Sequence, residues 1–97
     1  MRTVRWNKLA RIDFHENISY LMDEWSEKEA QSFIDKVFEI EVLLAKGNVE
    51  FQNTNRPGIK RCVINKHISL FYRVFDKRNV EFLRFWNNKK NLRNIYF

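Results

Sequence analysis

The feature that most constrains the fold is a change in hydrophobic period near Gly58. Before it, apolar residues recur every three or four positions, which is the period of an amphipathic helix. After it come three stretches rich in Ile, Val, Phe and Tyr, at residues 59–64, 68–75 and 80–86. Short β-prone runs with short polar joints predict a three-stranded antiparallel meander. We therefore expect an α+β fold in which helices pack on one face of a small sheet.

Two helices are predicted ahead of the meander. Asn7 is a suitable N-cap for the first, in which apolar residues follow mostly helical spacing. Ser26 and Glu29 form a capping box that separates it from the second. The second helix should end at Lys46 and Gly47, because a basic residue suits the last turn and glycine suits the residue after it. The apolar stripes of such an αα-hairpin need a sheet to cover them.

The remaining segments are short. Thr3–Trp6 is β-prone and is predicted to be an edge strand. Residues 48–58 are predicted to be a loop, in which Arg56-Pro57-Gly58 favours a turn with Pro and Gly at its two central positions. The tail, residues 87–97, is polar and basic but ends in Ile-Tyr-Phe. Nothing indicates a second domain, so residues 1–97 are expected to form one.

The predicted strands do not alternate cleanly between apolar and polar side chains, as strands with one solvated face do. In the strand at 68–75, Phe71 and Phe75 fall on the face opposite the main apolar set. Strict alternation along the last strand gives one face made of Val80, Phe82, Arg84 and Trp86. Because the helices can cover only one face, the tail, a partner chain or both must cover part of the other.

The positive charge belongs to the second half of the chain. The 97 residues carry a formal charge of +6. Residues 1–48 have seven basic and nine acidic side chains, whereas residues 49–97 have eleven basic and three acidic ones. This asymmetry, −2 against +8, indicates a polyanionic or acidic partner. Solubility alone is the alternative explanation.

Composition argues against several classes of protein. A single cysteine excludes a disulfide framework. Cys62, His15 and His67 cannot make a structural zinc site of the usual kind. We expect no metal and no cofactor. No signal peptide and no membrane-spanning stretch is visible, so a cytoplasmic protein without a membrane partner is predicted.

Two segments resemble a known family. Residues 66–74 read KHISLFYRV and are similar to the "H-x-L-F-Y-R-V" third strand of RelE/ParE toxins. Residues 80–91 are similar to the "V-E-I-L-R" fourth strand of that family and the segment after it. Six residues match the family's N-terminal pattern: Trp6, Ala10, Asp13, Ile18, Tyr20 and Trp25. The resemblance spans nearly the whole chain.

The resemblance implies the toxin of a bacterial type II toxin–antitoxin module, associated with growth inhibition and plasmid stabilisation. A cognate antitoxin would neutralise it by wrapping an extended, partly helical segment around it. RelE-like members cut mRNA in the ribosome, whereas ParE-like members inhibit DNA gyrase and are not nucleases. The toxin would reach DNA only through the antitoxin.

Cutting RNA without a metal requires a base, cations that stabilise the phosphorane, and an acid. If the chain is RelE-like, the resemblance assigns these roles to Lys60, Arg61, Arg73, Arg84 and Tyr96. The segment Trp86–Lys90 lacks the His or Tyr that the cleaving branch usually has there. This departure favours a ParE-like, non-catalytic toxin. A ribosome-dependent mRNA endoribonuclease and a basic nucleic-acid-binding module remain alternatives.

Other side chains are candidates for binding the target or the antitoxin. They are Phe71, Phe75, Trp86, Lys89, Lys90 and Arg93. Arg73 and Arg84 have a structural alternative, which is to pair with Glu81 or Asp76 across adjacent strands. Lys60 and Arg61 are consecutive, so they should point to opposite faces and at most one can serve a given site.

Overall fold

The computed structural model describes residues 1–47 and 49–97. The elements are β1 (Thr3–Trp6), α1 (Lys8–Glu24), α2 (Glu27–Lys46), β2 (Gln52–Asn53), β3 (Ile59–Val63), β4 (Ile68–Val74), β5 (Asn79–Asn87) and a short 3-10 helix, η1 (Leu92–Asn94). The strands form one sheet in the order β1-β5-β4-β3-β2. β1 runs parallel to β5, and the other neighbours are antiparallel. The predicted α+β class, edge strand and meander are confirmed.

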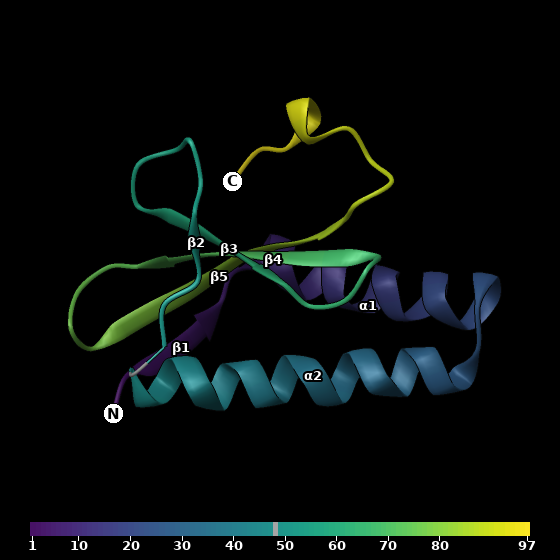
Figure 1. The fold of residues 1–97 in the computed structure, drawn as a ribbon, viewed down its shortest axis with the longest axis horizontal. Helices are drawn as coiled ribbons and strands as arrows, with labels where there is room; N and C mark the ends of the chain where they lie inside the picture. Colours follow the sequence, from purple (N-terminus) through teal and green to yellow (C-terminus); the bar gives the residue numbers. More distant parts are fainter. Residues whose placement is uncertain (48) are drawn as a thin grey trace.

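The sheet lies between two unequal layers (Figure 1). The α1–α2 hairpin covers one face, which we call the helix face. The C-terminal segment, residues 88–97, passes over the opposite side of the sheet. We call this segment the tail and the side it covers the tail face.

The helix boundaries follow from their capping residues. The Asn7 side chain accepts a hydrogen bond from the Ala10 N–H at 2.8 Å, and Ser26 Oγ accepts one from the Glu29 N–H at 3.1 Å. Gly47 ends α2 in the left-handed conformation, with φ of 78°. A residue with a Cβ would be strained there, which is why glycine suits the position. All three predicted helix ends are confirmed.

Residues 52–58, which were predicted to be loop, contain a short strand and a defined turn. The predicted loop begins at residue 48, which lies outside the described residues. Gln52 and Asn53 form the two-residue strand β2, which pairs with β3 and was missed because it carries no apolar signal. The predicted turn is confirmed: Gly58 has φ of 80°, and the Ile59 N–H donates to the Arg56 carbonyl at 3.2 Å.

The main core fills the space between the helix face and the hairpin. Tyr72 and Phe82 are among its fully buried members. Trp6 packs on Phe82 and Phe85 with ring centroids 5.5 and 5.1 Å apart, and its Nε1 donates to Glu41 at 2.9 Å. That hydrogen bond explains the single acidic residue in the otherwise apolar stripe of α2.

A β-bulge in β5 changes which side chains share a face. The register pairs Tyr72 with Phe82 but Phe71 with Arg84, so Leu83 is an extra residue without a partner in β4. Beyond the bulge, Phe85 joins the helix-face core, and Trp86 joins the apolar cluster beneath the tail. Strict alternation predicted that Trp86 shares a face with Val80 and Phe82. This prediction was wrong, because one inserted residue reverses the pleat for the rest of the strand.

Candidate functional site

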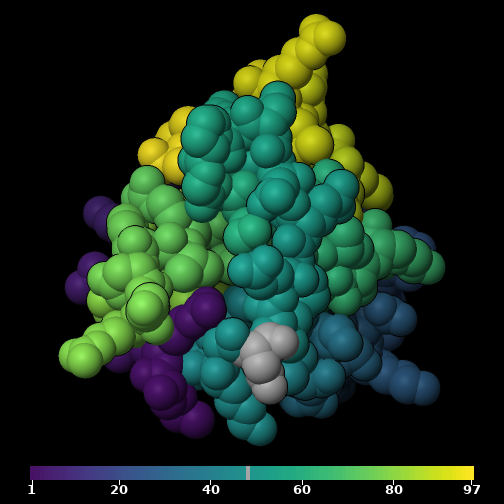
Figure 2. Space-filling view, turned by 60° about the vertical axis from the view of Figure 1, so that its left-hand side comes forward, coloured from purple at the N-terminus to yellow at the C-terminus, as the bar shows by residue number. Residues whose placement is uncertain are grey.

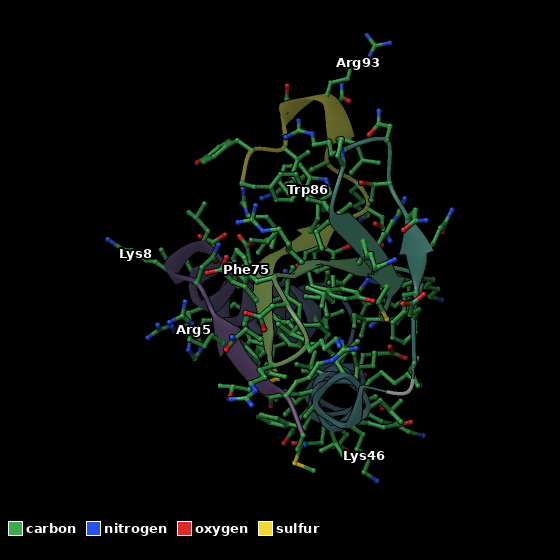
Figure 3. The ribbon with its side chains drawn as sticks, turned by 90° about the vertical axis from the view of Figure 1, so that its left-hand side faces the viewer. Arg5, Lys8, Lys46, Phe75, Trp86 and Arg93 are labelled. Carbon is green, nitrogen blue, oxygen red and sulfur yellow. The ribbon has the colours of Figure 1, made fainter. Side chains whose placement is uncertain are left out.

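Most of the predicted site residues lie on the tail face. Three strands contribute alternate side chains to it: Ile59, Arg61, Ser69, Phe71, Arg73, Arg84 and Trp86. Ile95 and Phe97 of the tail pack with Phe71 and Trp86 in a second, smaller apolar cluster. Figure 3 shows Trp86 between the sheet and the tail, on the side away from the helices. The tail therefore covers part of the second apolar face, as one of the sequence-based alternatives required.

Two arginine side chains hold the tail in place by donating hydrogen bonds to carbonyl groups of the tail. Arg56 Nη2 donates to the Ile95 carbonyl at 3.3 Å, and Arg84 Nη1 donates to the Tyr96 carbonyl at 2.9 Å. The Arg56 guanidinium also lies 5.0 Å from the centre of the Phe97 ring. These contacts tie the last three residues to two distant parts of the chain.

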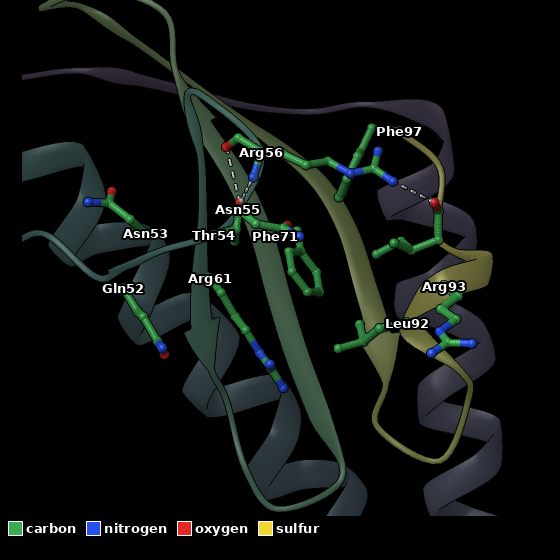
Figure 4. A pocket seen from close by; sticks show the side chains of 11 residues that line it. Gln52, Asn53, Thr54, Asn55, Arg56, Arg61, Phe71, Leu92, Arg93 and Phe97 are labelled. Carbon is green, nitrogen blue, oxygen red and sulfur yellow. Dashed lines mark hydrogen bonds between the residues drawn. The ribbon is translucent and has the colours of Figure 1, made fainter.

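A groove of about 470 Å³ separates the tail from the segment around β2. The space-filling view shows the tail beside the segment that contains β2 (Figure 2), and residues of both line the groove. Phe71 and Arg61 form its floor, Arg56 reaches across to the tail beside Phe97, and Arg93 lies on η1 (Figure 4). Three guanidinium groups and aromatic rings around one groove suit an acidic or phosphorylated ligand.

Arg84 is the most tightly held cation of the tail face. Only 6% of it is exposed, and its Nε and Nη2 donate to the two carboxylate oxygens of Asp13 at 2.7 and 3.0 Å. Its guanidinium also lies 5.2 and 5.1 Å from the centres of the Trp86 and Tyr96 rings. The hydrogen bonds that the Arg84 guanidinium donates to Asp13 raise the pKa of Arg84. The cross-strand partners proposed for Arg84, Glu81 and Asp76, are thus wrong, because the partner lies 71 positions earlier on α1.

Asp13 and Asn17 form hydrogen bonds with the backbone of β5 where β1 no longer pairs with it. β1 accompanies β5 only as far as the Trp6–Phe82 pair. Beyond it, the Phe85 N–H donates to Asp13 at 3.1 Å, and Asn17 Nδ2 donates to the Phe85 carbonyl at 2.9 Å. Asn17 was missed by the sequence analysis. Its signal is the four-residue spacing from Asp13, which puts both side chains on the buried stripe of α1.

The consecutive Lys60 and Arg61 point apart, as predicted. Arg61 Nε donates to Ser69 Oγ at 3.1 Å, and its guanidinium lies 5.7 Å from the centre of the Phe71 ring. Lys60 Nζ instead donates to Asn53 Oδ1 at 2.7 Å, on the β2 side. Of these two residues, only Arg61 lines the groove.

Arg73 lies nearer the other end of the sheet. Its guanidinium is 3.8 Å from Glu81 and 4.3 Å from the centre of the Phe75 ring. The predicted cross-strand pairing of Arg73 with Glu81 is confirmed. Phe75 is half exposed, and its ring packs against this guanidinium.

The five candidate catalytic residues do not form one cluster. Lys60 points away from the groove, and Arg73 and Arg84 are held in separate ion pairs. Tyr96 is 63% exposed and meets Arg84 through its ring and its carbonyl. Within residues 1–47 and 49–97, no hydrogen bond joins the Tyr96 hydroxyl to Arg61.

The basic residues of the tail are exposed. Arg93 projects from η1 away from the rest of the molecule (Figure 3). Lys90 Nζ lies 5.5 Å from the centre of the Trp86 ring, and Lys89 Nζ lies 5.3 Å from that of Tyr20. Among the described residues, no group of three or more His, Cys, Asp or Glu side chains is arranged to hold a metal ion, and none of the helices has the length and hydropathy of a membrane span.

Comparison with known proteins decides the family. The family model described as "ParE toxin of type II toxin-antitoxin system, parDE" matches residues 4–92. The chain belongs to this family. A search of curated proteins gives no significant match.

Solved structures share the fold of this ParE-family toxin at low sequence identity. A chain of the chromosomal ParDE system of P. aeruginosa has 16% identity and a TM-score of 0.72, over 90% of this chain and 96% of that one. A copper-bound mutant toxin from Helicobacter pylori has 18% identity and a TM-score of 0.66, over 92% and 97%. A chain of the DinJ–YafQ complex of E. coli has 10% identity and a TM-score of 0.62, over 92% and 96%.

Proposed function

We propose that this ParE-family toxin inhibits growth by binding DNA gyrase without catalysing a reaction, and that a cognate antitoxin neutralises it. The observation that carries the proposal is the buried Arg84–Asp13 pair. At the position where the cleaving branch would place a catalytic arginine, the guanidinium is used entirely within the fold.

A cation that stabilises a transition state must be free to meet the charge that develops there. The three nitrogens of the Arg84 guanidinium already donate to Asp13 and to the Tyr96 carbonyl. Moving Arg84 toward a phosphate would leave the Asp13 carboxylate buried without its cation, which costs about 3–5 kcal/mol. This cost argues against a catalytic role for Arg84.

The groove is the proposed contact surface for an acidic partner. Arg56, Arg61 and Arg93 surround it, and Phe71 and Phe97 supply apolar area. Aromatic and arginine side chains are the ones that most often dominate binding energy at interfaces. Two structural neighbours are named as toxin–antitoxin assemblies, ParDE and DinJ–YafQ, which supports an antitoxin as the partner of this chain.

One observation favours the alternative, an mRNA endoribonuclease. Arg61 is partly exposed and lines the groove together with Arg56 and Arg93, so a phosphodiester bound there would meet cationic side chains. Tyr96 is the exposed phenol nearest in sequence to that groove, and it would have to supply the acid.

Two assays, one on the purified protein and one in cells, separate these functions. Purified protein is added to DNA gyrase in a supercoiling assay, and mRNA 5′ ends are mapped after brief induction in a bacterial host. We expect inhibited supercoiling and no new mRNA ends at ribosomal A sites. New A-site ends with unaffected supercoiling would refute the proposal.

Tyr96→Phe sharpens the test, because it removes only a hydroxyl group. A toxin that acts by binding through the groove should inhibit growth as strongly with Phe at position 96. A nuclease that uses this hydroxyl as its acid should lose about 10²–10⁴-fold in cleavage rate. Lys77→Gln, in the exposed β4–β5 turn, is the control for a surface change elsewhere.

A further inference from the structure

A second hollow lies where the end of α1, the β3–β4 turn and the end of β5 meet. It has a volume of about 350 Å³ and is lined by Trp25, Lys66, His67, Asn88 and Lys89. We call it the corner pocket. It shares no lining residue with the groove on the tail face, and the proposed function makes no use of it.

The backbone of the corner pocket is fixed by asparagine side chains and strand contacts. Asn65 Oδ1 accepts hydrogen bonds from the N–H groups of His67 and Ile68 at 2.8 and 2.9 Å. The Asn88 N–H donates to the His67 carbonyl at 2.6 Å. His67 is therefore held from both sides, and its ring position is set by the fold.

The His67 imidazole is buried against aromatic rings. Only 8% of the residue is exposed, and its ring centre lies 4.5 Å from that of Trp25 and 6.3 Å from that of Tyr20. Its Nε2 atom is shielded from water and has no hydrogen-bond partner among the described residues. A buried polar nitrogen without a partner is costly. An anion bound in the pocket that His67 lines would favour a proton on this ring.

Two lysines flank the same pocket. Lys66 Nζ lies 4.8 Å from the centre of the Trp25 ring, and Lys89 Nζ lies 5.3 Å from that of Tyr20. Cation–π contacts of this length keep the ammonium groups close to the pocket. Trp25 itself is 48% exposed, so an indole surface is available beside the charges.

We propose that the corner pocket binds a phosphate group of a single-stranded nucleic acid. Lys66 and Lys89 act as point charges, the His67 ring that lines the pocket adds positive charge when it is protonated, and Trp25 stacks with the adjacent base. The exposed indole favours a nucleotide, because a base can stack on the ring beside the two charges that hold its phosphate. Direct contact with nucleic acid departs from the sequence-based expectation that the toxin reaches DNA only through an antitoxin.

Binding at the corner pocket is expected to depend on pH. Burial, followed by the charges of Lys66 and Lys89, lowers the pKa of His67, and Glu29 of α2 partly opposes this. Tyr20, whose own pKa is lowered chiefly by the neighbouring Lys89 ammonium, is the other titratable group facing the imidazole. A bound phosphate favours the imidazolium, so it should raise the pKa of His67. Proton uptake then makes binding tighter as the pH falls.

The first test follows the His67 ring by NMR in the full chain. The ring signals are titrated with pH in the presence of sodium chloride, inorganic phosphate, or a 5′-phosphorylated single-stranded decanucleotide, at matched ionic strength. We expect both phosphate ligands to raise the pKa of His67. The ring signals of His15, which is exposed on α1, are the internal reference. An unchanged His67 titration in both ligands would overturn the proposal.

The second test measures oligonucleotide affinity by fluorescence anisotropy. Replacing two exposed cations, as in Lys66→Gln with Lys89→Gln, should weaken binding about fivefold or more. It should also reduce the slope of log affinity against log salt by about 1.4. Lys28→Gln with Lys77→Gln removes the same charge from exposed positions away from the pocket and should change affinity less than about twofold.

One further outcome in each test would refute the proposal. In the second test it is an equal loss in the control pair, which would mean binding by net charge alone. In the first test it is a shift of the His67 titration with inorganic phosphate but not with the oligonucleotide, which would exclude a nucleic-acid ligand. Gyrase inhibition is measured on the same variants, so failure of the corner pocket and failure of the proposed function are seen separately.

Discussion

The two sides of the sheet bury their residues by different means. The helix face is covered by two regular helices whose apolar stripes fill one continuous core. The tail face is covered by a short irregular segment, and its stability depends on guanidinium groups with fixed partners, above all Arg84 with Asp13. The comparison shows that a basic side chain on the surface of this fold can already be bound to a partner within the fold. Only cations without such a partner are available to bind a ligand.

The largest effect should come from removing the partner of the buried cation. Asp13→Ala leaves Arg84 without its counter-charge and the Phe85 N–H without an acceptor, so we expect a loss of about 3–5 kcal/mol of unfolding free energy. Urea unfolding followed by circular dichroism measures it. A loss below about 1 kcal/mol would show that the tail face does not depend on this pair.

A core truncation on the helix face should cost less. Leu44 is fully buried in α2, and Leu44→Ala is expected to destabilise the fold by about 3 kcal/mol through lost burial and the cavity left behind. The same urea experiment applies, with Val42→Ala at an exposed position of α2 as the control. If the two variants lose the same free energy, the account of the helix-face core is wrong.

A truncation in the tail should act locally. Ile95→Ala removes a buried side chain from the small cluster beneath the tail, and we expect the tail to detach before the sheet unfolds. Global stability should fall by less than about 1 kcal/mol, while amide exchange of residues 92–97 speeds up. If amide exchange in β4 and β5 became faster by the same factor as in the tail, the tail and the sheet would instead unfold as one cooperative unit.

The smallest effect is the pH dependence due to His67. Because burial lowers the pKa of His67, the unfolded chain takes up a proton at higher pH than the folded one. The resulting stability is complete above the unfolded value of about 6.5 and is lost as the pH falls toward the folded value. His67→Gln should flatten the stability curve between pH 7 and pH 5, about the range in which histidine titrates. An unchanged slope would contradict this.

Local chemistry made much of the fold predictable. Asn7, Ser26 and Gly47 determine the helix ends through contacts within a few residues. The turn at Gly58 is also determined by residues next to it in sequence. The strands were visible because their apolar runs are long compared with the polar joints. These elements depend on near neighbours in sequence, which a pattern can show.

Long-range contacts were not predictable from the pattern. Nothing near Arg84 in sequence indicates Asp13, which lies 71 positions away. The bulge at Leu83 adds one residue without a marker such as glycine, so the face of Trp86 was assigned wrongly. Several candidate site residues, among them Arg61, Phe71 and Trp86, lie together on the tail face, but the sequence did not show this shared face or their partners.

The most direct test of the central claim combines Asp13→Asn with Arg84→Met. Replacing both members of a buried ion pair by groups of similar size is often neutral for stability, so this variant should fold. Its growth inhibition is measured in a bacterial host at matched protein level. We predict inhibition equal to that of the natural chain, because Arg84 is structural. A folded variant without toxicity would contradict the account and assign Arg84 a direct role.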